Sequence, residues 1–221
     1  MNIMSSYTLI IGNKNYSSWS LRPWFWMKHA GIGFEEKRVP LSTEDTARHL
    51  AEYFSNYKVP VLQDDDFVIW DSLAILEYLA DKHSDKHGWP DDRRARATAR
   101  SVSAEMHSSF TALRGELPMN CRKRFKDFNI SPAAQKDVDR IKALWKSCRD
   151  QYGQGGPWLF GDFCIADAMF APVALRFIGY EVPLNDQERE YIQTIMQDPH
   201  IINWVKSGQQ EKEVIDIDEA R

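Results

Sequence analysis

Hydroxyl side chains gather in residues 15–22, whose sequence is Asn-Tyr-Ser-Ser-Trp-Ser-Leu-Arg. This segment lies between an apolar run typical of a buried strand, residues 7–12, and a helical pattern, residues 19–30. Serine hydroxyls at such a junction can cap the helix, and the unpaired N–H groups of its first turn favour an anion. A thiolate held there has its pKa lowered by the same forces. Plain capping is the alternative interpretation.

A second candidate is the pair Val59-Pro60, which follows Lys58 and precedes a short apolar run. Proline has no N–H group and adopts a cis peptide bond more readily than other residues. A cis bond would turn the backbone of Val59 outward, so that its N–H and C=O could pair with an extended, peptide-like ligand. A trans proline that opens an edge strand is the alternative.

A third candidate is Asp71-Ser72, at the start of a helical pattern over residues 72–83. The Ser72 hydroxyl, the first N–H groups and the helix dipole can bind a carboxylate. The Asp71 carboxylate could accept an amine. Capping again explains the same residues without a ligand.

The elements that must position these candidates form a regular series. Strand patterns cover residues 7–12, 34–39, 61–63 and 67–70, and helical patterns cover residues 19–30, 43–53 and 72–83. The order is β-α-β-α-β-β-α. A crossover helix implies that the first two strands are parallel, and the short turn at Asp64-Asp65-Asp66 implies an antiparallel hairpin. This predicts a small mixed sheet with helices on its faces.

The sequence pattern changes after residue 82. A polar linker with glycine and proline follows, and beyond it we find no strand pattern. Helical patterns cover residues 91–117, 131–152, 165–178, 186–196 and 199–206. The second part of the chain is therefore predicted to be all-helical.

Taken together, these features resemble the glutathione transferase superfamily. The family combines a thioredoxin-like α/β N-terminal domain, β-α-β-α-β-β-α, with an all-α C-terminal domain. The resemblance implies a glutathione-binding domain at 1–84, a linker at 85–90 and a helical domain at 91–221. Residues 161–167, Gly-Asp-Phe-Cys-Ile-Ala-Asp, resemble the family's Gly-Asp-x-Ser/Thr-x-Ala-Asp segment, which caps a core helix. Cys164 and Asp167 are then structural.

The resemblance also implies site residues. Residues 17–22 look like the Ser-Ser-Cys-Ser-Trp-Arg segment of bacterial zeta-class, maleylacetoacetate isomerase-like members, in which the first serine stabilises the thiolate of glutathione. Ser17 is therefore the expected catalytic residue and Ser18 the reserve. Lys58, Val59 and Pro60 are expected to bind glutathione, with Val59 pairing with its cysteinyl backbone.

The acidic-Ser pair of the family, here Asp71-Ser72, holds the γ-glutamyl end of glutathione. Tyr7 and Tyr16 are conceivable tyrosine-type activators. Arg176 stands nine residues after Asp167, a spacing that differs from that of the zeta arginine contacting substrate carboxylates. The resemblance therefore supports glutathione binding more strongly than isomerase activity.

The expected function is conjugation of the glutathione thiolate to a small electrophile, with glutathione as co-substrate and no metal. A zeta-type, glutathione-dependent cis-trans isomerase and a non-catalytic glutathione transferase-like scaffold are the alternatives. The resemblance also implies a homodimer. Arg93, Arg96 and Arg100 share one helix face, which is either solvated or part of the subunit interface.

Other clusters are weaker candidates. His83 and His87 have metal-ligand spacing, but Gly88 and Pro90 indicate a linker. The three aspartates at 64–66 are typical of a turn. Residues 122–126, Arg-Lys-Arg-Phe-Lys, could contact phosphate, although the charge balance offers little support for that.

Composition and charge exclude some further classes of partner and location. Of the net charge of −4, residues 211–221 supply −3, so the body is nearly neutral and nucleic acid is not an expected partner. No apolar run approaches the roughly 20 residues of a membrane span. Three cysteines without a C-x-x-C pair and no signal sequence at the start favour a cytoplasmic setting.

Overall fold

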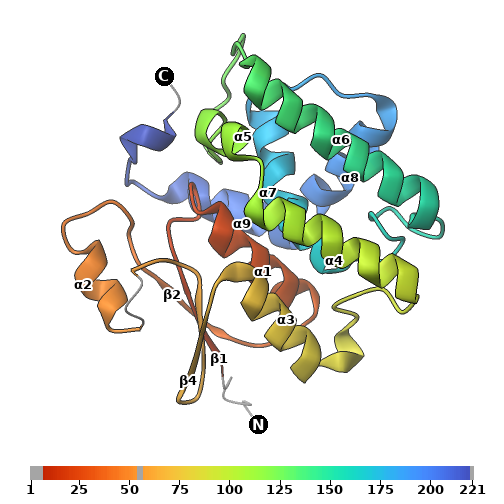
Figure 1. Ribbon diagram of the computed structural model, residues 1–221. Coiled ribbons are helices and arrows are strands. Elements are labelled where there is room, and N and C mark those ends of the chain that lie inside the picture. Colours follow the sequence, from red (N-terminus) through yellow and green to blue (C-terminus); the bar gives the residue numbers. More distant parts are fainter. Residues whose placement is uncertain (1–6, 54–56, 220–221) are drawn as a thin grey trace.

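The computed structural model describes residues 7–53 and 57–219 (Figure 1). The prediction made for the start of the chain falls on residues 1–6, which lie outside these residues. Residues 7–82 contain β1 (Tyr7–Ile11), α1 (Ser18–His29), β2 (Glu35–Arg38), α2 (Thr46–Ala51), β3 (Val61–Asp64), β4 (Phe67–Trp70) and α3 (Ser72–Lys82). This is the predicted order of elements, so the predicted fold class is confirmed.

The four strands form one mixed sheet in the order β2-β1-β3-β4. β1 is parallel to β2, with Leu9 opposite Glu36, and antiparallel to β3, with Leu9 opposite Leu62. β3 and β4 form the antiparallel hairpin expected from the short turn. Asp65 occupies that turn with a φ of 54°, a left-handed conformation that aspartate tolerates.

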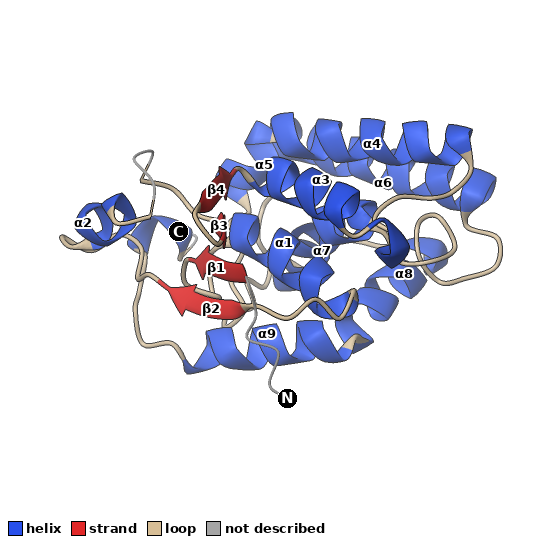
Figure 2. Cartoon of the chain, turned by 90° about the horizontal axis from the view of Figure 1, so that it is seen from below, coloured by secondary structure: helices blue, strands red, loops and turns tan. Residues whose placement is uncertain are grey.

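The two faces of the sheet bury different residues because side chains alternate along a strand. Leu9, Ile11 and Leu62 belong to the main core, which includes residues of α1 and α3. Ile10 and Val61 point to the other face, where a small cluster includes a residue of α2. Figure 2 shows α2 on one side of the sheet and α1 with α3 on the other. The loop that carries Ser17 directly follows the carboxyl end of β1 and leads into α1.

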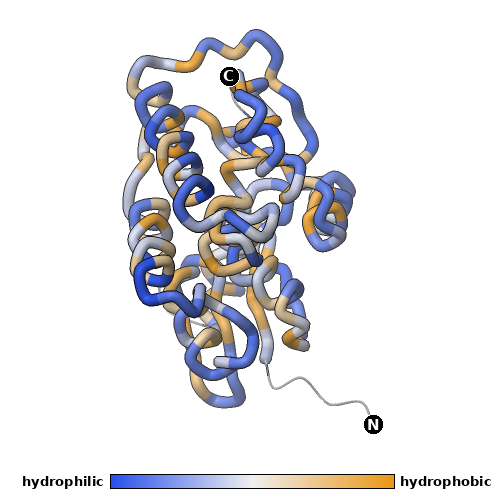
Figure 3. Tube along the Cα trace, turned by 90° about the vertical axis from the view of Figure 1, so that its right-hand side faces the viewer, coloured by the Kyte–Doolittle hydropathy of each residue, from blue (hydrophilic) through white to orange (hydrophobic). Residues whose placement is uncertain are grey.

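The rest of the described chain is helical, apart from two isolated β-bridges at residues 158–162. It contains α4 (Arg93–Ser108), α5 (Thr111–Glu116), α6 (Pro132–Tyr152), α7 (Ile165–Gly179), α8 (Asp186–Gln197) and α9 (Pro199–Gln210), with single 3₁₀ turns η1 (Ser84–Lys86) and η2 (Asp216–Asp218). Figure 3 shows hydrophilic and apolar residues alternating along the outer helices, as expected for helices with one face on a core.

The predicted single helix over residues 91–117 is wrong. The chain breaks it into α4 and α5 at Ser109 and Phe110. Phe110 has a φ of 63°, and its side chain is buried in the core. Hydrophobic periodicity continues through such a break because both helices face the same core, so the pattern alone does not reveal it.

The helix α7 is the centre of the helical part, since nearly all of its side chains are buried. Cys164 is its N-cap residue. The Asp167 carboxylate accepts hydrogen bonds from the backbone N–H groups of Cys164 (3.0 Å) and Leu159 (3.1 Å) and from the Tyr191 hydroxyl (3.0 Å). Burial raises the pKa of Asp167 to about 6. These contacts fit the structural role expected of the segment.

Within the described residues, no helix has the length and apolar character needed to cross a membrane. The cysteines Cys121, Cys148 and Cys164 are free thiols, and all three are buried.

Candidate active site

A cavity of about 730 Å³ lies where the sheet meets the helical part of the chain. Every residue predicted to be catalytic or to bind glutathione lines it. These residues are Ser17, Ser18, Lys58, Val59, Pro60, Asp71 and Ser72. They come from three segments that are far apart in sequence, and the folded sheet brings them to one edge.

Ser17 lies at the end of the β1–α1 loop, where it caps α1. Its hydroxyl accepts a hydrogen bond from the Ser20 backbone N–H (3.4 Å) and donates one to the Ser20 Oγ (2.8 Å). Ser20 in turn accepts a bond from the Gly12 N–H (3.1 Å). The side chain of Ser17 is 7% exposed, and it reaches the cavity from the helix N-terminus. The Ser17 Oγ therefore caps α1, and the same atom is the one that the anion-site interpretation assigns to a thiolate.

Ser18 is the first residue of α1, and its environment is different. Its Oγ accepts a hydrogen bond from the Arg176 guanidinium of α7 (3.3 Å). Both serines line the cavity. Ser18 contacts Arg176 of α7, whereas the hydrogen bonds of Ser17 are to Ser20 of its own helix.

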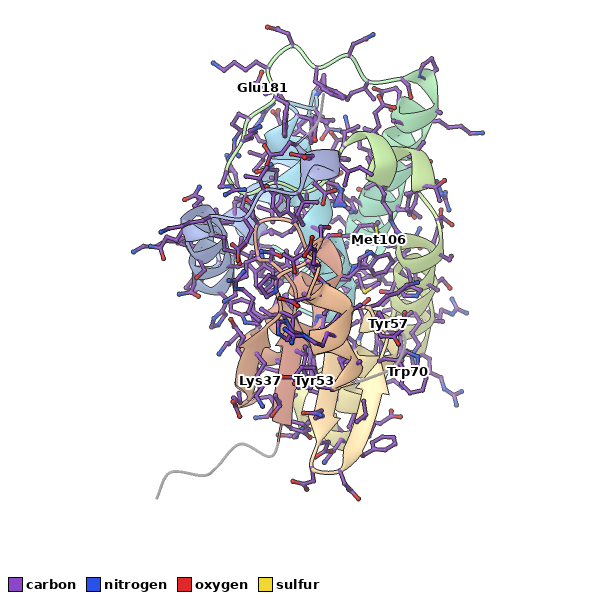
Figure 4. The ribbon with its side chains drawn as sticks, turned by 90° about the vertical axis from the view of Figure 1, so that its left-hand side faces the viewer. Lys37, Tyr53, Tyr57, Trp70, Met106 and Glu181 are labelled. Carbon is purple, nitrogen blue, oxygen red and sulfur yellow. The ribbon has the colours of Figure 1, made fainter. Side chains whose placement is uncertain are left out.

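The Val59–Pro60 peptide bond is cis, as the family resemblance implies. Pro60 is buried directly before β3, and Val59 packs in part against the small cluster under α2. Neighbouring Tyr57 and, on β4, Trp70 are exposed and line the same cavity. Figure 4 shows Tyr57 and Trp70 on one side of the molecule, below Met106 of α4.

Asp71 stands at the N-cap of α3 with a φ of 74°. One carboxylate oxygen, Oδ1, accepts hydrogen bonds from the N–H groups of Leu73 (2.9 Å) and Ala74 (3.2 Å). The other, Oδ2, lies 3.1 Å from Nε2 of His107 on α4. The predicted amine acceptor thus has one oxygen committed to the helix and the other turned toward a residue of the helical part. Burial lowers the pKa of His107.

Beneath Ser72 lies a buried arginine. Arg22 is 2% exposed, and its Nη1 lies 3.4 Å from the Ser72 hydroxyl, to which it donates. Its Nε has no hydrogen-bond partner among the described residues. Burial and the neighbouring charges of Arg114 and Arg176 lower the pKa of Arg22 well below its usual value. The N-terminus of α3 already favours a bound carboxylate at Ser72. The Arg22 guanidinium adds positive charge beneath that position.

Trp19 separates two of these cations. Its ring lies 4.3 Å from the Arg22 guanidinium carbon and 4.7 Å from that of Arg114. Such contacts between a guanidinium and an aromatic face are favourable. Trp19 also lines the cavity, and it packs edge-on against His107. The lining of the cavity thus combines aromatic side chains with positively charged guanidinium groups.

The two tyrosine alternatives have other partners. The Tyr16 hydroxyl donates to Glu219 and accepts from Arg122 (2.5 Å). Burial and Glu219 raise the pKa of Tyr16. Tyr7 starts β1, at the end of the strand away from the Ser17 loop, and its hydroxyl lies 2.9 Å from His83. Tyr7 is not among the residues that line the cavity.

Several lining residues had no sequence signal. They are Leu41, Tyr57, Trp70, His107, Arg114, Pro118, Met119 and Asp218. Most lie outside the β-α-β-α-β-β-α region. Arg114 lay inside a helical pattern, and Asp218 lay in an acidic tail that sequence reasoning treated only as charge. Only the fold shows that these segments meet the Ser17 loop.

Three of the other sequence candidates, Asp64, Arg96 and Arg100, have partners within the chain. Asp64 is buried and accepts from the Tyr78 hydroxyl (2.5 Å) and from Lys82. Arg96 donates to the carbonyl of Pro90 (2.9 Å), and Arg100 pairs with Glu77 (3.2 Å). In the described part of the chain, no three His, Cys, Asp or Glu side chains are grouped as a metal site.

Comparisons with known proteins identify the family to which the chain belongs. The family model "Glutathione S-transferase, N-terminal domain" matches residues 16–82. The probable maleylacetoacetate isomerase of Caenorhabditis elegans is 36% identical over 160 residues, which cover 71% of this chain and 72% of that protein. The maleylacetoacetate isomerase of Rattus norvegicus is 28% identical over 158 residues, covering 67% and 70%.

Among solved structures, a glutathione transferase homolog from Burkholderia gl BGR1, with bound glutathione, matches with a TM-score of 0.71 and 26% identity. The match covers 93% of this chain and 99% of that chain. The chain therefore belongs to the glutathione transferase family. Its relatives include maleylacetoacetate isomerases, which confirms the resemblance to maleylacetoacetate isomerase-like members. The role of Ser17 stays a prediction.

Proposed function

We propose that this chain is a serine-type glutathione transferase that joins the glutathione thiolate to a small electrophile. The convergence of residues 17–18, 58–60 and 71–72 on one cavity carries the proposal. The cis bond before Pro60 agrees with the arrangement that the family resemblance implies.

In the proposed complex, glutathione lies extended along the sheet edge. Its γ-glutamyl carboxylate binds at the Ser72 hydroxyl and the α3 N-terminus, above the Arg22 guanidinium. Its γ-glutamyl amine pairs with Asp71, and its cysteinyl backbone pairs with Val59. The sulfur then lies near Ser17.

The proposed chemistry depends on the Ser17 hydroxyl as a hydrogen-bond donor. When a thiolate is present, that hydroxyl turns from Ser20 to the sulfur, and the α1 N-terminus adds its dipole. The thiol proton passes to solvent water and not to Ser17, because an aliphatic hydroxyl has no accessible anion at neutral pH. Each pKa unit by which the thiol is lowered corresponds to about 1.4 kcal/mol of thiolate stabilisation. The sulfur then forms a bond to the electrophilic carbon, whose leaving group departs with its electron pair.

A second candidate function is a zeta-type cis-trans isomerase. The 36% identity with the probable maleylacetoacetate isomerase of Caenorhabditis elegans supports it. In this case glutathione adds to a maleyl double bond and is released after rotation, so it is not consumed. An assay with a maleyl substrate separates the two functions by whether free glutathione falls.

We also propose the division into residues 1–84 and 91–221 with a linker at 85–90, and a homodimer. Phe67 and Trp70 support the dimer, because they are 56% and 47% exposed on the edge strand β4. Large exposed apolar side chains on an edge strand are typical of a covered surface. The proposed setting is cytoplasmic.

The experiment is a calorimetric titration of the full chain with glutathione, followed by a conjugation assay with a chlorodinitrobenzene. Binding together with enzyme-dependent release of chloride supports the transferase. Binding without turnover of either the chloroarene or a maleyl substrate supports a non-catalytic scaffold. Absence of glutathione binding contradicts the proposal.

A further inference from the structure

Residues 211–219, which we call the C-terminal strap, run from the end of α9 back to the site (Figure 1). The strap begins at Glu211, whose carboxylate accepts hydrogen bonds from the backbone N–H groups of Lys14 (2.8 Å) and Asn15 (3.0 Å). Those two residues belong to the β1–α1 loop that carries Ser17. The strap is therefore attached to the site at its first residue.

Arg122, from the loop after α5, holds the middle of the strap. Its guanidinium donates to the carbonyl oxygens of Glu211 (2.6 Å) and Glu213 (2.9 Å) and to the Tyr16 hydroxyl (2.5 Å). One side chain thus joins the strap to the segment directly before Ser17. Arg122, the first residue of the basic cluster at residues 122–126, is therefore engaged in contacts within the chain.

The far end of the strap is also fixed. Glu219 accepts hydrogen bonds from the Tyr16 hydroxyl and from Asn120 (3.2 Å), and it pairs with Lys123. Glu211 and Glu219 therefore hold both ends of the strap. Asp218, next to Glu219 in η2, is placed by these anchors.

Asp218 is half-buried and lines the cavity. Burial raises the pKa of Asp218, the positive charge of Arg176 acts to lower it, and the negative charge of Glu219 acts to raise it. Asp218 is thus held in place by the anchors of the strap, and Arg176 is the cation that lines the same cavity from α7.

Arg176 is the matching group on α7. It is 7% exposed, lines the cavity, and donates from Nη2 to Ser18. In the part of the chain that the structure describes, its Nε has no hydrogen-bond partner. Burial and the nearby Arg114 lower the pKa of Arg176 to about 10, so it is cationic at neutral pH. The helical side of the cavity therefore contains two guanidinium groups: Arg114, whose opposing charge is Asp137, and Arg176, whose opposing charge is Asp218.

We propose that Asp218 is a specificity-determining residue that limits which electrophiles reach Arg176, by acting as its counter-charge in the cavity. The inference rests on the proposed function and concerns the electrophile side of the same site. An electrophile with a negative group competes with Asp218 for Arg176, while a neutral electrophile of the same shape does not. Removing the carboxylate charge should therefore favour anionic electrophiles specifically.

The reaction that tests this proposal is substitution on a matched pair of chloroarenes, 4-chloro-3,5-dinitrobenzoate and 4-chloro-3,5-dinitrobenzamide. The glutathione sulfur bonds to the ring carbon that carries chlorine, the C–Cl bond breaks, and chloride leaves with the electron pair. The two conjugates differ in charge and hardly in shape. Their dissociation constants can be measured by calorimetry whether or not the protein turns over.

The variants are Asp218→Asn and, as a matched control, Asp216→Asn on the same 3₁₀ turn. Asp216 is exposed and is not a lining residue. We expect Asp218→Asn to improve carboxylate-conjugate binding about fivefold relative to the carboxamide conjugate, as one partly screened charge would. Asp216→Asn should leave that ratio unchanged. Arg176→Gln should shift the ratio in the opposite direction, and in that background Asp218→Asn should have a smaller effect.

Glutathione itself is the third ligand in each titration. If every variant binds glutathione but Asp218→Asn leaves the ratio unchanged, the Asp218 inference is overturned and the proposed function stands. An equal shift in Asp216→Asn also overturns it, because the effect would then be one of net charge. If the wild type binds neither glutathione nor a conjugate, the proposed function fails and the inference fails with it. Circular dichroism checks each fold, and Asp218→Ser replaces the asparagine variant if that variant is unfolded.

Discussion

Gly208 of α9 lies so close to Asn15 that a Cβ atom at position 208 would stand 2.9 Å from the Asn15 backbone nitrogen. The same face of α9 buries Trp204, whose indole N–H donates to the carbonyl of Lys14 (2.9 Å). The last long helix of the chain therefore packs directly on the backbone of the loop that carries Ser17. That loop is positioned as much by the C-terminal helix as by β1.

The first prediction concerns this contact. Gly208→Ala should destabilise the protein by about 1–3 kcal/mol, because backbone atoms of the loop must move to admit the methyl group. Gly115→Ala is the matched control, since a Cβ there meets nothing within 4 Å and the residue is helical. It should stabilise the protein by up to about 1 kcal/mol. Urea unfolding measures both, and equal effects from the two variants would refute the close-contact argument.

The second prediction concerns the charge of Asp71. Asparagine tolerates the left-handed backbone of this position and caps a helix as well as aspartate does, so Asp71→Asn removes charge with little change in structure. Glutathione affinity should fall about five- to twentyfold, since a charge-assisted hydrogen bond to its amine is lost. Asp66→Asn, at the exposed β3–β4 turn, is the control and should bind normally. Calorimetry that finds equal affinities in both variants would remove Asp71 from the binding role.

The third prediction concerns the buried carboxyl of Asp167. Its three donors cannot all be satisfied by an amide, so Asp167→Asn should cost about 2–4 kcal/mol of stability. Asp162→Asn, at an exposed position five residues earlier, should cost almost nothing. Urea unfolding at neutral pH compares them, and similar stabilities would contradict the role of Asp167 in holding α7.

The fourth prediction is a pH dependence of the same site. The folded-state pKa of Asp167, about 6, lies above its ordinary 3.8, so the folded chain keeps a proton that the unfolded chain loses between those values. The stability that Asp167 contributes therefore falls as the pH rises through this window and is constant above it. The penalty of Asp167→Asn should be larger near pH 4 than near pH 7. A penalty that grows with pH would contradict the raised pKa.

Sequence patterns were sufficient to predict the sheet and the site residues that lie in the sheet region of the chain. The strands and helices of residues 7–82 follow from periodicity, and Ser17, Val59-Pro60 and Asp71-Ser72 lie at junctions that such an order brings to one edge. Local signals work here because each candidate sits at the end of an element, and the topology fixes where the ends meet.

The helical side of the site could not be predicted in the same way. His107, Arg114 and Asp218 reach the cavity through tertiary packing and through the strap, and none stands in a distinctive local motif. The break at Phe110 was hidden because α4 and α5 share a core. Likewise, the acidic tail had the charge pattern of a solvated terminus, while in the fold Glu211 accepts from backbone N–H groups of the Ser17 loop and Glu219 accepts from the Tyr16 hydroxyl.

The central claim is that Ser17 stabilises the thiolate of bound glutathione, and the thiol pKa of bound glutathione tests it most directly. The pKa can be followed through the ultraviolet absorbance of the thiolate in complexes of the wild type, Ser17→Ala and Ser18→Ala. We predict a wild-type value well below the roughly 8.5 of a free cysteine thiol. Ser17→Ala should raise it by about one unit with little change in glutathione affinity, while Ser18→Ala should leave it nearly unchanged. A bound thiol with the same pKa in Ser17→Ala and in the wild type would contradict the account.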